Sequence, residues 1–238
     1  MKCPVNIYRL ISFMILSLYS CSPTHLKSLK TVQRILNVQR TAIPSNTRQL
    51  LVVYNSNNKN PEAVLLAVER VKTEWKISLG PIPAGIGENG FATPGDKTEG
   101  DGKTPGGIFK LGHLYTYDAE VKTQMPYSQT TSDDKWIDDP ESDEYNQHIQ
   151  GETNAKSYEN LKLNSNHYKY CMVIEYNTNP VEKGKGSAIF FHLRMSPDET
   201  TAGCVAVLEP DMIKILKWMN PEFQPMILMG NNEDLLSQ

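Results

Sequence analysis

The chain has 238 residues, of which 39% are hydrophobic and 21% are charged, and its formal net charge is -3. This is an ordinary globular composition, sufficient for one sizeable core and too small for two large domains. The charge is uneven, because residues 1–61 contain eight Lys or Arg and no acidic residue, while the remainder carries -11. An acidic main part argues against nucleic acid as a partner, since phosphate binding requires positive charge.

The first twenty residues have the pattern of a secretory signal peptide. Lys2 and Arg9 flank the start, residues 10–18 form a short apolar core, and Ser20 offers a small residue for cleavage. The apolar core is too short to be a membrane span of the mature protein. We therefore expect an exported protein.

A lipid anchor is expected directly after this signal. Leu-Tyr-Ser-Cys at residues 18–21 resembles a bacterial lipobox, in which Cys21 is lipidated and becomes the new N-terminus. Tyr19 is bulkier than the usual residue, so cleavage to a soluble protein stays open as the alternative. The preferred expectation is a periplasmic lipoprotein that is anchored to a membrane through Cys21.

Residues 21–47 are predicted to form a basic tether. The positive charges of this segment are Lys27, Lys30, Arg34 and Arg40. Its apolar residues are spaced to line one side of a short helix, and they are Leu26, Leu29, Val32, Ile35 and Leu36. A solvated linker is the preferred interpretation. The alternative is a segment that lies against an anionic lipid surface beside the anchor.

Residues 48–231 are predicted to form one mostly β domain, followed by a C-terminal tail at residues 232–238. Apolar runs separated by turn residues predict strands at residues 50–54, 63–71, 75–79, 108–111, 170–176, 188–193, 204–208 and 226–229. One helix is clear at residues 210–219, since Pro210 suits its first position and Pro221 ends it. The expected fold is mostly antiparallel, with this helix directly after the Cys204 strand.

A long polar insertion at residues 118–168 interrupts this series. Connections longer than about 15 residues are commonly lids or binding loops. Because the insertion carries Trp136 and Tyr145, we expect these two aromatic side chains to bind substrate. The seven acidic residues between Asp133 and Glu144 lack the spacing of a calcium loop, so a solvated acidic loop is expected there.

His192 and Cys204 are the candidate catalytic pair. The imidazole ends a buried strand, and the thiol follows twelve residues later, after a polar loop. A thiol becomes a strong nucleophile only as a thiolate, and a neighbouring histidine can take its proton. The competing interpretation is a small buried cysteine beside a hydrogen-bonded core histidine.

The residues around this pair add three expectations. Gly203 allows a close approach of substrate, and its backbone amide and that of Cys204 can point at a developing oxyanion. Thr201 adds a hydroxyl group in the same turn, and we expect it to contact substrate. Arg194 lies two residues after His192, so both face the same side if the strand continues. We expect Arg194 to bind a terminal carboxylate, with a solvent-facing arginine as the alternative.

No metal or other cofactor is expected. Residues 101–104 resemble the tail of a nucleotide-binding loop, but Lys97 stands where the earlier glycine belongs, and Pro105 follows where a helix should run. A zinc site would need two more ligands beside His192 and Cys204, at a spacing that the other histidines do not offer. Cys171, in an apolar strand, is expected to be buried and unbridged.

Four motifs, in order along the chain, together resemble the L,D-transpeptidase catalytic domain family of the YkuD type. They are Gly-Asp-Gly-Lys-Thr-Pro at 100–105, Trp-x-Asp-Asp-Pro at 136–140, Gly-Lys-Gly-Ser-Ala-Ile-Phe at 184–190 and Thr-Ala-Gly-Cys-Val-Ala at 201–206. The last motif marks the branch that the chain resembles most. The resemblance implies a β-rich mixed sandwich or barrel and an exported bacterial enzyme that acts on peptidoglycan stem peptides.

The resemblance also implies the chemistry. Cys204 would attack the amide before a terminal D-alanine and form a thioester, with His192 as the base. An amine of a second stem peptide would then give a cross-link, and water would give carboxypeptidase or endopeptidase activity. Many members carry a second histidine and an Arg or Asn where this chain has Ala202 and Ala206. Transfer and hydrolysis therefore both stay open, as does a non-catalytic wall-binding lipoprotein with the same fold.

Overall fold

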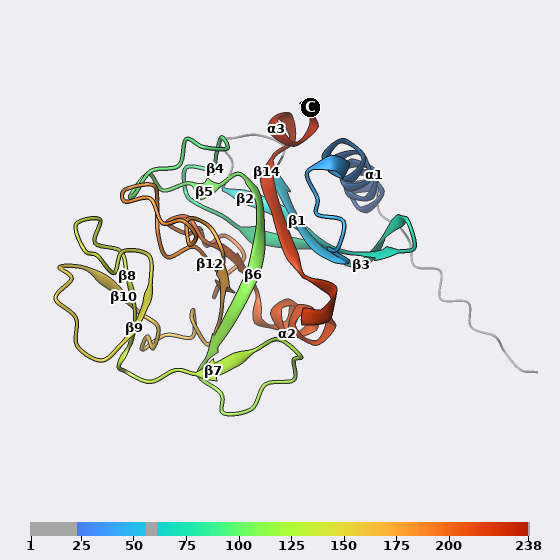
Figure 1. Ribbon diagram of the computed structural model, residues 1–238. Helices are drawn as coiled ribbons and strands as arrows, with labels where there is room; N and C mark the ends of the chain where they lie inside the picture. Colours follow the sequence, from blue (N-terminus) through green and yellow to red (C-terminus); the bar gives the residue numbers. More distant parts are fainter. Residues whose placement is uncertain (1–22, 56–60, 238) are drawn as a thin grey trace, which may run out of the picture.

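A computed structural model describes residues 23–55 and 61–237 of the chain (Figure 1). The predicted signal peptide and the predicted lipidation site at Cys21 lie outside these residues. In the described part, one large mixed β-sheet is accompanied by two smaller sheets and a few helices. The mostly β fold that the sequence predicts is confirmed.

The large sheet is built from nine strands. These are β1 (Gln49–Asn55), β2 (Glu62–Val71), β3 (Glu74–Gly85), β6 (Gly107–Thr116), β7 (Tyr127–Gln129), β11 (Tyr170–Ile174), β12 (Phe190–Leu193), β13 (Val205–Val207) and β14 (Met226–Asn231). The two smaller sheets contain β4 (Phe91–Ala92) with β5 (Thr104–Pro105), and β8 (Asp134–Ile137) with β9 (His148–Gln150) and β10 (Tyr158–Asn160). The helices are α1 (Pro23–Val38), α2 (Glu209–Trp218) and α3 (Asn232–Leu236), with short 3-10 turns η1 (Gln39–Thr41) and η2 (Pro221–Phe223).

The large sheet closes on itself. Its strand order is β11-β12-β13-β3-β2-β1-β14-β6-β7, and β6 also pairs with β11, which joins the two sides into a barrel. Most of the pairings are antiparallel, but β1 with β14, β12 with β13 and β6 with β7 are parallel. The parallel pair β12 and β13 carries the candidate catalytic residues, so its register decides how they meet.

Strand β1 contains an uninterrupted apolar run at residues 50–54, and the packing on its two faces explains this run. Successive side chains of a strand point to opposite faces. Leu51 and Val53 join the core inside the barrel, whereas Leu50 and Val52 join a second core on its outside. Both faces are covered, so every residue of β1 is buried.

Helix α2 closes the lower end of the barrel in Figure 1 and adds Met212, Ile215 and Leu216 to the inner core. The predicted helix at 210–219 is thus confirmed within one residue at each end.

Helix α1 corrects the expectation of a solvated linker. Val32, Ile35 and Leu36 are buried and pack against the outer faces of β1, β2 and β14. Lys27 and Arg34 stay exposed on the opposite side of the helix. The interpretation as a linker fails because an apolar stripe at helical spacing gains more by covering the sheet than by facing water. The same packing makes these buried side chains unavailable to a lipid surface.

The insertion at residues 118–168 is also more ordered than expected. It forms β7 and the sheet β10-β8-β9, which lies on the other side of the barrel from α1 (Figure 1). Its apolar side chains, such as Trp136 and Leu161, join a third core with Phe190 on the outer face of β12. Among the described residues, no helix is long and apolar enough to cross a bilayer.

Candidate active site

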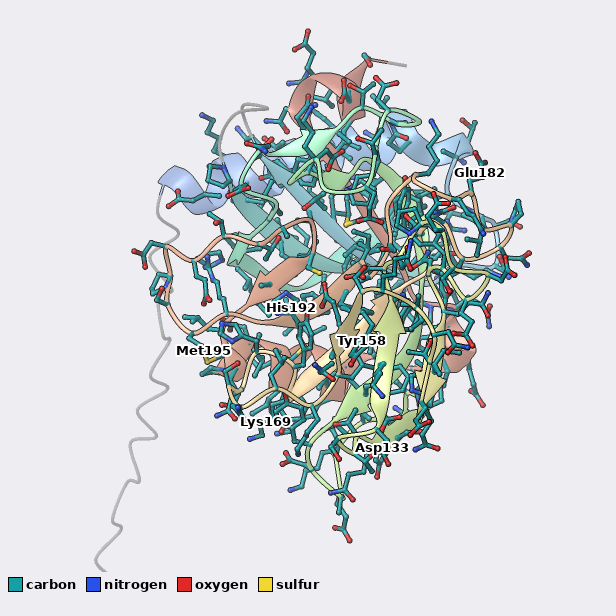
Figure 2. The ribbon with its side chains drawn as sticks, turned by 90° about the vertical axis from the view of Figure 1, so that its left-hand side faces the viewer. Asp133, Tyr158, Lys169, Glu182, His192 and Met195 are labelled. Atoms are coloured by element: carbon teal, nitrogen blue, oxygen red, sulfur yellow. The ribbon has the colours of Figure 1, made fainter. Side chains whose placement is uncertain are left out.

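The register of β12 and β13 brings the imidazole and the thiol to one face. Phe191 pairs with Val205, and His192 pairs with Ala206. Phe191 and Val205 belong to the core inside the barrel. By alternation, His192 and Cys204 point outward, toward the insertion. Figure 2 shows His192 near the middle of this side, between labelled residues of the insertion and of the loop after β12.

His192 and Cys204 line a common cavity of about 190 Å³. The barrel and the loop before Cys204 supply one wall of the cavity, which includes Ala206. The other wall comes from the insertion, through Glu159 and Tyr168. The candidate pair therefore lies in a partly open hollow that is large enough to hold part of a peptide.

The Cys204 side chain is buried, with 7% of its surface exposed. Its Sγ atom donates to the carbonyl of Ala188 and accepts from the amide of Phe190, both at 3.3 Å. Burial raises the pKa of the Cys204 thiol, and the nearby Glu159 carboxylate raises it further. The resting group is thus a thiol and not a thiolate. Cys171 is fully buried, and both cysteines are unbridged, as predicted.

The His192 imidazole is held in a form that can accept a proton. Its Nδ1 atom lies 2.7 Å from the carbonyl of Leu193 and donates to it, which leaves Nε2 as the acceptor. Burial lowers the pKa of His192 to about 4, so the ring is neutral at neutral pH. Within the described residues, no hydrogen bond joins His192 to Cys204. Proton transfer therefore requires the thiol to exchange its bond to Ala188 for one to the imidazole.

The turn before Cys204 is fixed by two hydroxyl groups. Oγ1 of Thr201 accepts from the amide of Gly203 at 3.1 Å and donates to the carbonyl of Cys204 at 2.7 Å. Thr104 donates to the same carbonyl at 3.2 Å. Thr104 belongs to the Gly-Asp-Gly-Lys-Thr-Pro motif, so this motif helps to fix the backbone at Cys204. A side chain at position 203 would come within 2.9 Å of the Lys103 carbonyl, which explains the glycine.

These contacts bear on two expectations. The Thr201 hydroxyl positions the loop before Cys204, and Thr201 also lines the cavity, so its contact with substrate stays a prediction. The Gly203 amide is bonded to Thr201 in the resting state. Of the two predicted oxyanion donors, the amide of Cys204 is therefore the one that we retain for the resting geometry.

Arg194 lies in the wall of the same cavity but is only 3% exposed. One guanidinium nitrogen, Nη1, donates to the carbonyl of Pro197 at 2.6 Å. The Nε atom is buried and finds no hydrogen-bond partner among the described residues. The predicted role of Arg194, binding a terminal carboxylate, stays a prediction that this position allows.

Trp136 and Tyr145 do not line the cavity. Trp136 is buried, meets the Phe190 ring edge-on at 5.2 Å and donates to Asn146 at 2.8 Å. Tyr145 is 1% exposed, and its hydroxyl donates to the carboxylate of Glu99. Their contacts give the two rings a packing role in this arrangement, and the expectation that they bind substrate gains no support from the cavity lining. A large aromatic side chain in a polar segment commonly packs against the core.

Several lining residues of the cavity escaped the sequence analysis, and two of them lie on the wall opposite Cys204. Glu159 lies in β10, and Tyr168 lies just before β11. The Tyr168 hydroxyl donates to the Glu159 carboxylate, and the Tyr168 ring meets that of His192 edge-on at 5.2 Å. Neither belongs to a motif. Only the alternation of Tyr158, Glu159 and Asn160 hints at an inward-facing acid.

The conserved pattern of the L,D-transpeptidase catalytic domain family (YkuD) matches residues 44–228, which include both His192 and Cys204. The chain belongs to this family. A similar solved structure is the helical cell shape determining protein Pgp2 from Campylobacter jejuni, with 13% sequence identity and a TM-score of 0.37. The match covers 84% of this chain and 56% of Pgp2, so the chain spans little more than half of the length of Pgp2. A comparison with curated proteins gave no match.

In this L,D-transpeptidase-family domain, two methyl groups face the reacting pair. Ala202 and Ala206 both line the cavity, and Ala206 is the register partner of His192. The polar groups nearest to the pair therefore come from elsewhere in the chain. The polar residues that line the cavity with the pair include Glu159, Tyr168, Arg194, His167 and Glu199.

Proposed function

We propose that the protein is an exported cysteine acyltransferase of the cell wall, which acts on peptidoglycan stem peptides through a thioester on Cys204. The observation that carries the proposal is the shared cavity of His192 and Cys204, within a domain of the L,D-transpeptidase family. The neutral imidazole and the neutral thiol are the protonation states from which such a reaction starts.

The residues suggest the order of the first half-reaction. Nε2 of His192 takes the thiol proton, and the sulfur of Cys204 attacks the carbonyl carbon of the amide before a terminal D-alanine. The oxyanion that forms is stabilised by the amide of Cys204. The carbon–nitrogen bond then breaks, and the imidazolium gives its proton to the leaving amine. D-alanine departs, and the acyl group stays on Cys204 as a thioester.

Arg194 is the proposed recognition group for the donor. Arg194 lines the cavity, and a guanidinium group can bind a carboxylate through two parallel hydrogen bonds. The carboxylate of the terminal D-alanine fits this role. Such a contact would place the scissile amide at the mouth of the cavity, next to Cys204.

The second half-reaction can use an amine or water. An amine of another stem peptide would form a new amide bond and a cross-link. Hydrolysis is the second candidate function, because a cavity of about 190 Å³ has room for several water molecules beside the neutral base. In both cases His192 takes a proton from the nucleophile, and the thiol is restored as the carbon–sulfur bond breaks.

We also propose export and lipidation at Cys21, on the basis of the N-terminal pattern. Expression of the full chain with a labelled fatty acid tests this. Label should enter the wild type and be lost from Cys21→Ser, which should also leave the membrane fraction. Label that persists in Cys21→Ser would overturn the assignment.

The reaction is tested with disaccharide tetrapeptides, the wild-type protein and the variants Cys204→Ala and Cys171→Ala. We expect loss of D-alanine with wild type and Cys171→Ala, and no product with Cys204→Ala. A product of monomer mass indicates hydrolysis, and a dimer indicates transpeptidation. If no muropeptide gives a Cys204-dependent product, a wall-binding protein without catalytic activity is the better account.

A further inference from the structure

The wall of the cavity that faces Cys204 contains a carboxyl group that the proposed mechanism does not use. Glu159 belongs to β10 and is partly buried. It accepts a hydrogen bond from the Tyr168 hydroxyl, which fixes one carboxylate oxygen. The Tyr168 ring in turn packs edge-on against His192 at 5.2 Å and Phe190 at 5.6 Å. Glu159 is therefore held in a defined place, two contacts away from the base.

The charged groups around Glu159 leave it without a cation. On the insertion side its charged neighbours are two further acids, Asp138 and Glu99. Across the cavity, Glu199 is bonded to His167 at 2.6 Å, and Arg194 is bonded to a backbone carbonyl. Among the described residues, no Lys, Arg or His forms an ion pair with Glu159. Keeping a partly buried carboxylate ionised among other acidic groups costs free energy, and a bound positive charge offsets that cost.

The ionisation of Glu159 reflects these surroundings. Burial raises the pKa of Glu159 to about 7, and the acids Asp138 and Glu99 act in the same direction. The hydrogen bond from Tyr168 lowers the pKa and limits the rise. Near neutral pH the group is thus close to its midpoint, where a bound cation changes its charge most.

We propose that Glu159 is a specificity-determining residue of the active site, and that its carboxylate, held by Tyr168, binds a protonated amine of the substrate beside Cys204. The identity of the substrate as a stem peptide rests on the proposed function, but the preference for a cation does not. Glu159 also opposes ionisation of the Cys204 thiol. An amine that neutralises Glu159 would therefore make Cys204 more reactive as it binds.

The charge preference is tested with two small thiol reagents of different charge. Full-length protein reacts at pH 8.5 with methyl methanethiosulfonate, which is neutral, and with its trimethylammonium-ethyl analogue, which is cationic. The rate at Cys204 is followed by peptide mass spectrometry. The ratio of cationic to neutral rate should fall about tenfold in Glu159→Gln, which corresponds to roughly one pKa unit of differential interaction. The matched control is Glu182→Gln, which removes an exposed charge outside the cavity and should leave the ratio unchanged.

The pH dependence separates a charge effect from a structural one. In the wild type the ratio should rise with pH around a midpoint near 7, as Glu159 ionises. In Tyr168→Phe, which keeps the ring but loses the hydroxyl, the midpoint should move to higher pH. His167→Asn should retain the wild-type midpoint, since His167 faces Glu199 and not Glu159. The Tyr168→Phe profile keeps the test decisive if Glu159→Gln fails to fold.

A ratio that is equal in folded Glu159→Gln and wild type would overturn the proposal, as would a midpoint that Tyr168→Phe leaves in place. Neither outcome depends on peptidoglycan. If the charge preference is absent while muropeptides are still turned over by Cys204, only the role of Glu159 fails. If the preference is present without muropeptide turnover, only the proposed function fails.

Discussion

Two outer faces of the barrel are covered by other segments, and the side chains buried beneath the two covers differ in chemistry. On one face α1 covers β1, β2 and β14 with a core that is almost entirely aliphatic. On the other the insertion covers β11 and β12, and a thiol, an imidazole, a phenol and a carboxyl group share one cavity there. Both faces arise from the same alternation of side chains along the strands. The difference lies in the groups that each cover buries, because α1 contributes an apolar stripe, whereas the insertion brings ionisable side chains to the cavity of Cys204.

This contrast predicts that substitutions on the α1 face change stability alone, whereas those on the insertion face change chemistry. The largest expected effect is that of His192→Asn. The Asn amide can keep the hydrogen bond to the Leu193 carbonyl, but it has no counterpart of Nε2. Turnover should fall roughly 10²- to 10⁴-fold, the usual contribution of a general base, with little change in the melting temperature. The variant His167→Asn serves as the control, and equal turnover of His192→Asn and wild type would remove His192 from the mechanism.

The second effect belongs to the α1 face. Ile35 is fully buried in the aliphatic core, so Ile35→Ala leaves a cavity. We expect a loss of about 2 to 5 kcal/mol in the free energy of unfolding, measured by urea denaturation, with unchanged turnover per folded molecule. Leu26→Ala, at a side chain that is 48% exposed, should cost much less. An Ile35→Ala protein that is as stable as wild type would show that α1 does not seal this face.

The third effect is a pH dependence of stability on the insertion face. The pKa of His192 is about 4 in the folded protein, against its ordinary value of 6.5. Below pH 6.5 the unfolded chain therefore binds a proton that the folded protein refuses, and stability is lost as the pH falls toward 4. This loss should approach about 3 kcal/mol and be absent in His192→Asn.

Glu159 contributes the opposite slope, because its raised pKa means that the folded protein takes up a proton before the unfolded chain does. The informative quantity is therefore the difference between wild type and His192→Asn at each pH, measured by thermal unfolding. A difference that stays constant between pH 7 and pH 4 would contradict a buried neutral imidazole.

The smallest effect concerns the loop of the nucleophile. Thr201→Val removes a hydroxyl that joins the Gly203 amide to the Cys204 carbonyl. Since Thr104 still donates to that carbonyl, we expect a loss of only about 1 kcal/mol in stability. The rate of Cys204 acylation should fall more than the stability suggests, and Thr201→Ser should restore it. Equal acylation rates in Thr201→Val and wild type would show that the turn holds its shape without this hydroxyl.

The sequence predicted those parts of the fold in which local pattern and burial agree. The strand at 50–54 is one example, because its uninterrupted apolar run matches a strand buried on both faces. The helix at 210–219 is another, because apolar periodicity and flanking prolines point the same way. The helical spacing of Val32, Ile35 and Leu36 was visible, but the sheet face that it covers was not. A pattern shows that a stripe can be buried, while the partner that buries it depends on tertiary structure.

The residues of the candidate site also differ in whether the local sequence or only the tertiary structure shows their role. His192 and Cys204 were predictable, since a thiol after a glycine and an imidazole at the end of a strand carry their chemistry in the local sequence. The residue type of Trp136 favours substrate binding, but its burial outside the Cys204 cavity shows a packing role that the sequence did not predict. Glu159 was missed, because it reaches the cavity only through the folding of a segment 45 residues before Cys204.

The most direct test of the account is the detection of an acyl group on Cys204. Wild-type protein is mixed with a stem tetrapeptide, quenched with acid and examined by intact-mass and peptide mass spectrometry. We predict an adduct with the mass of the donor less D-alanine, located on the peptide that contains Cys204, released by hydroxylamine and absent from Cys204→Ala. An adduct on another residue, or turnover that persists in Cys204→Ala, would contradict it.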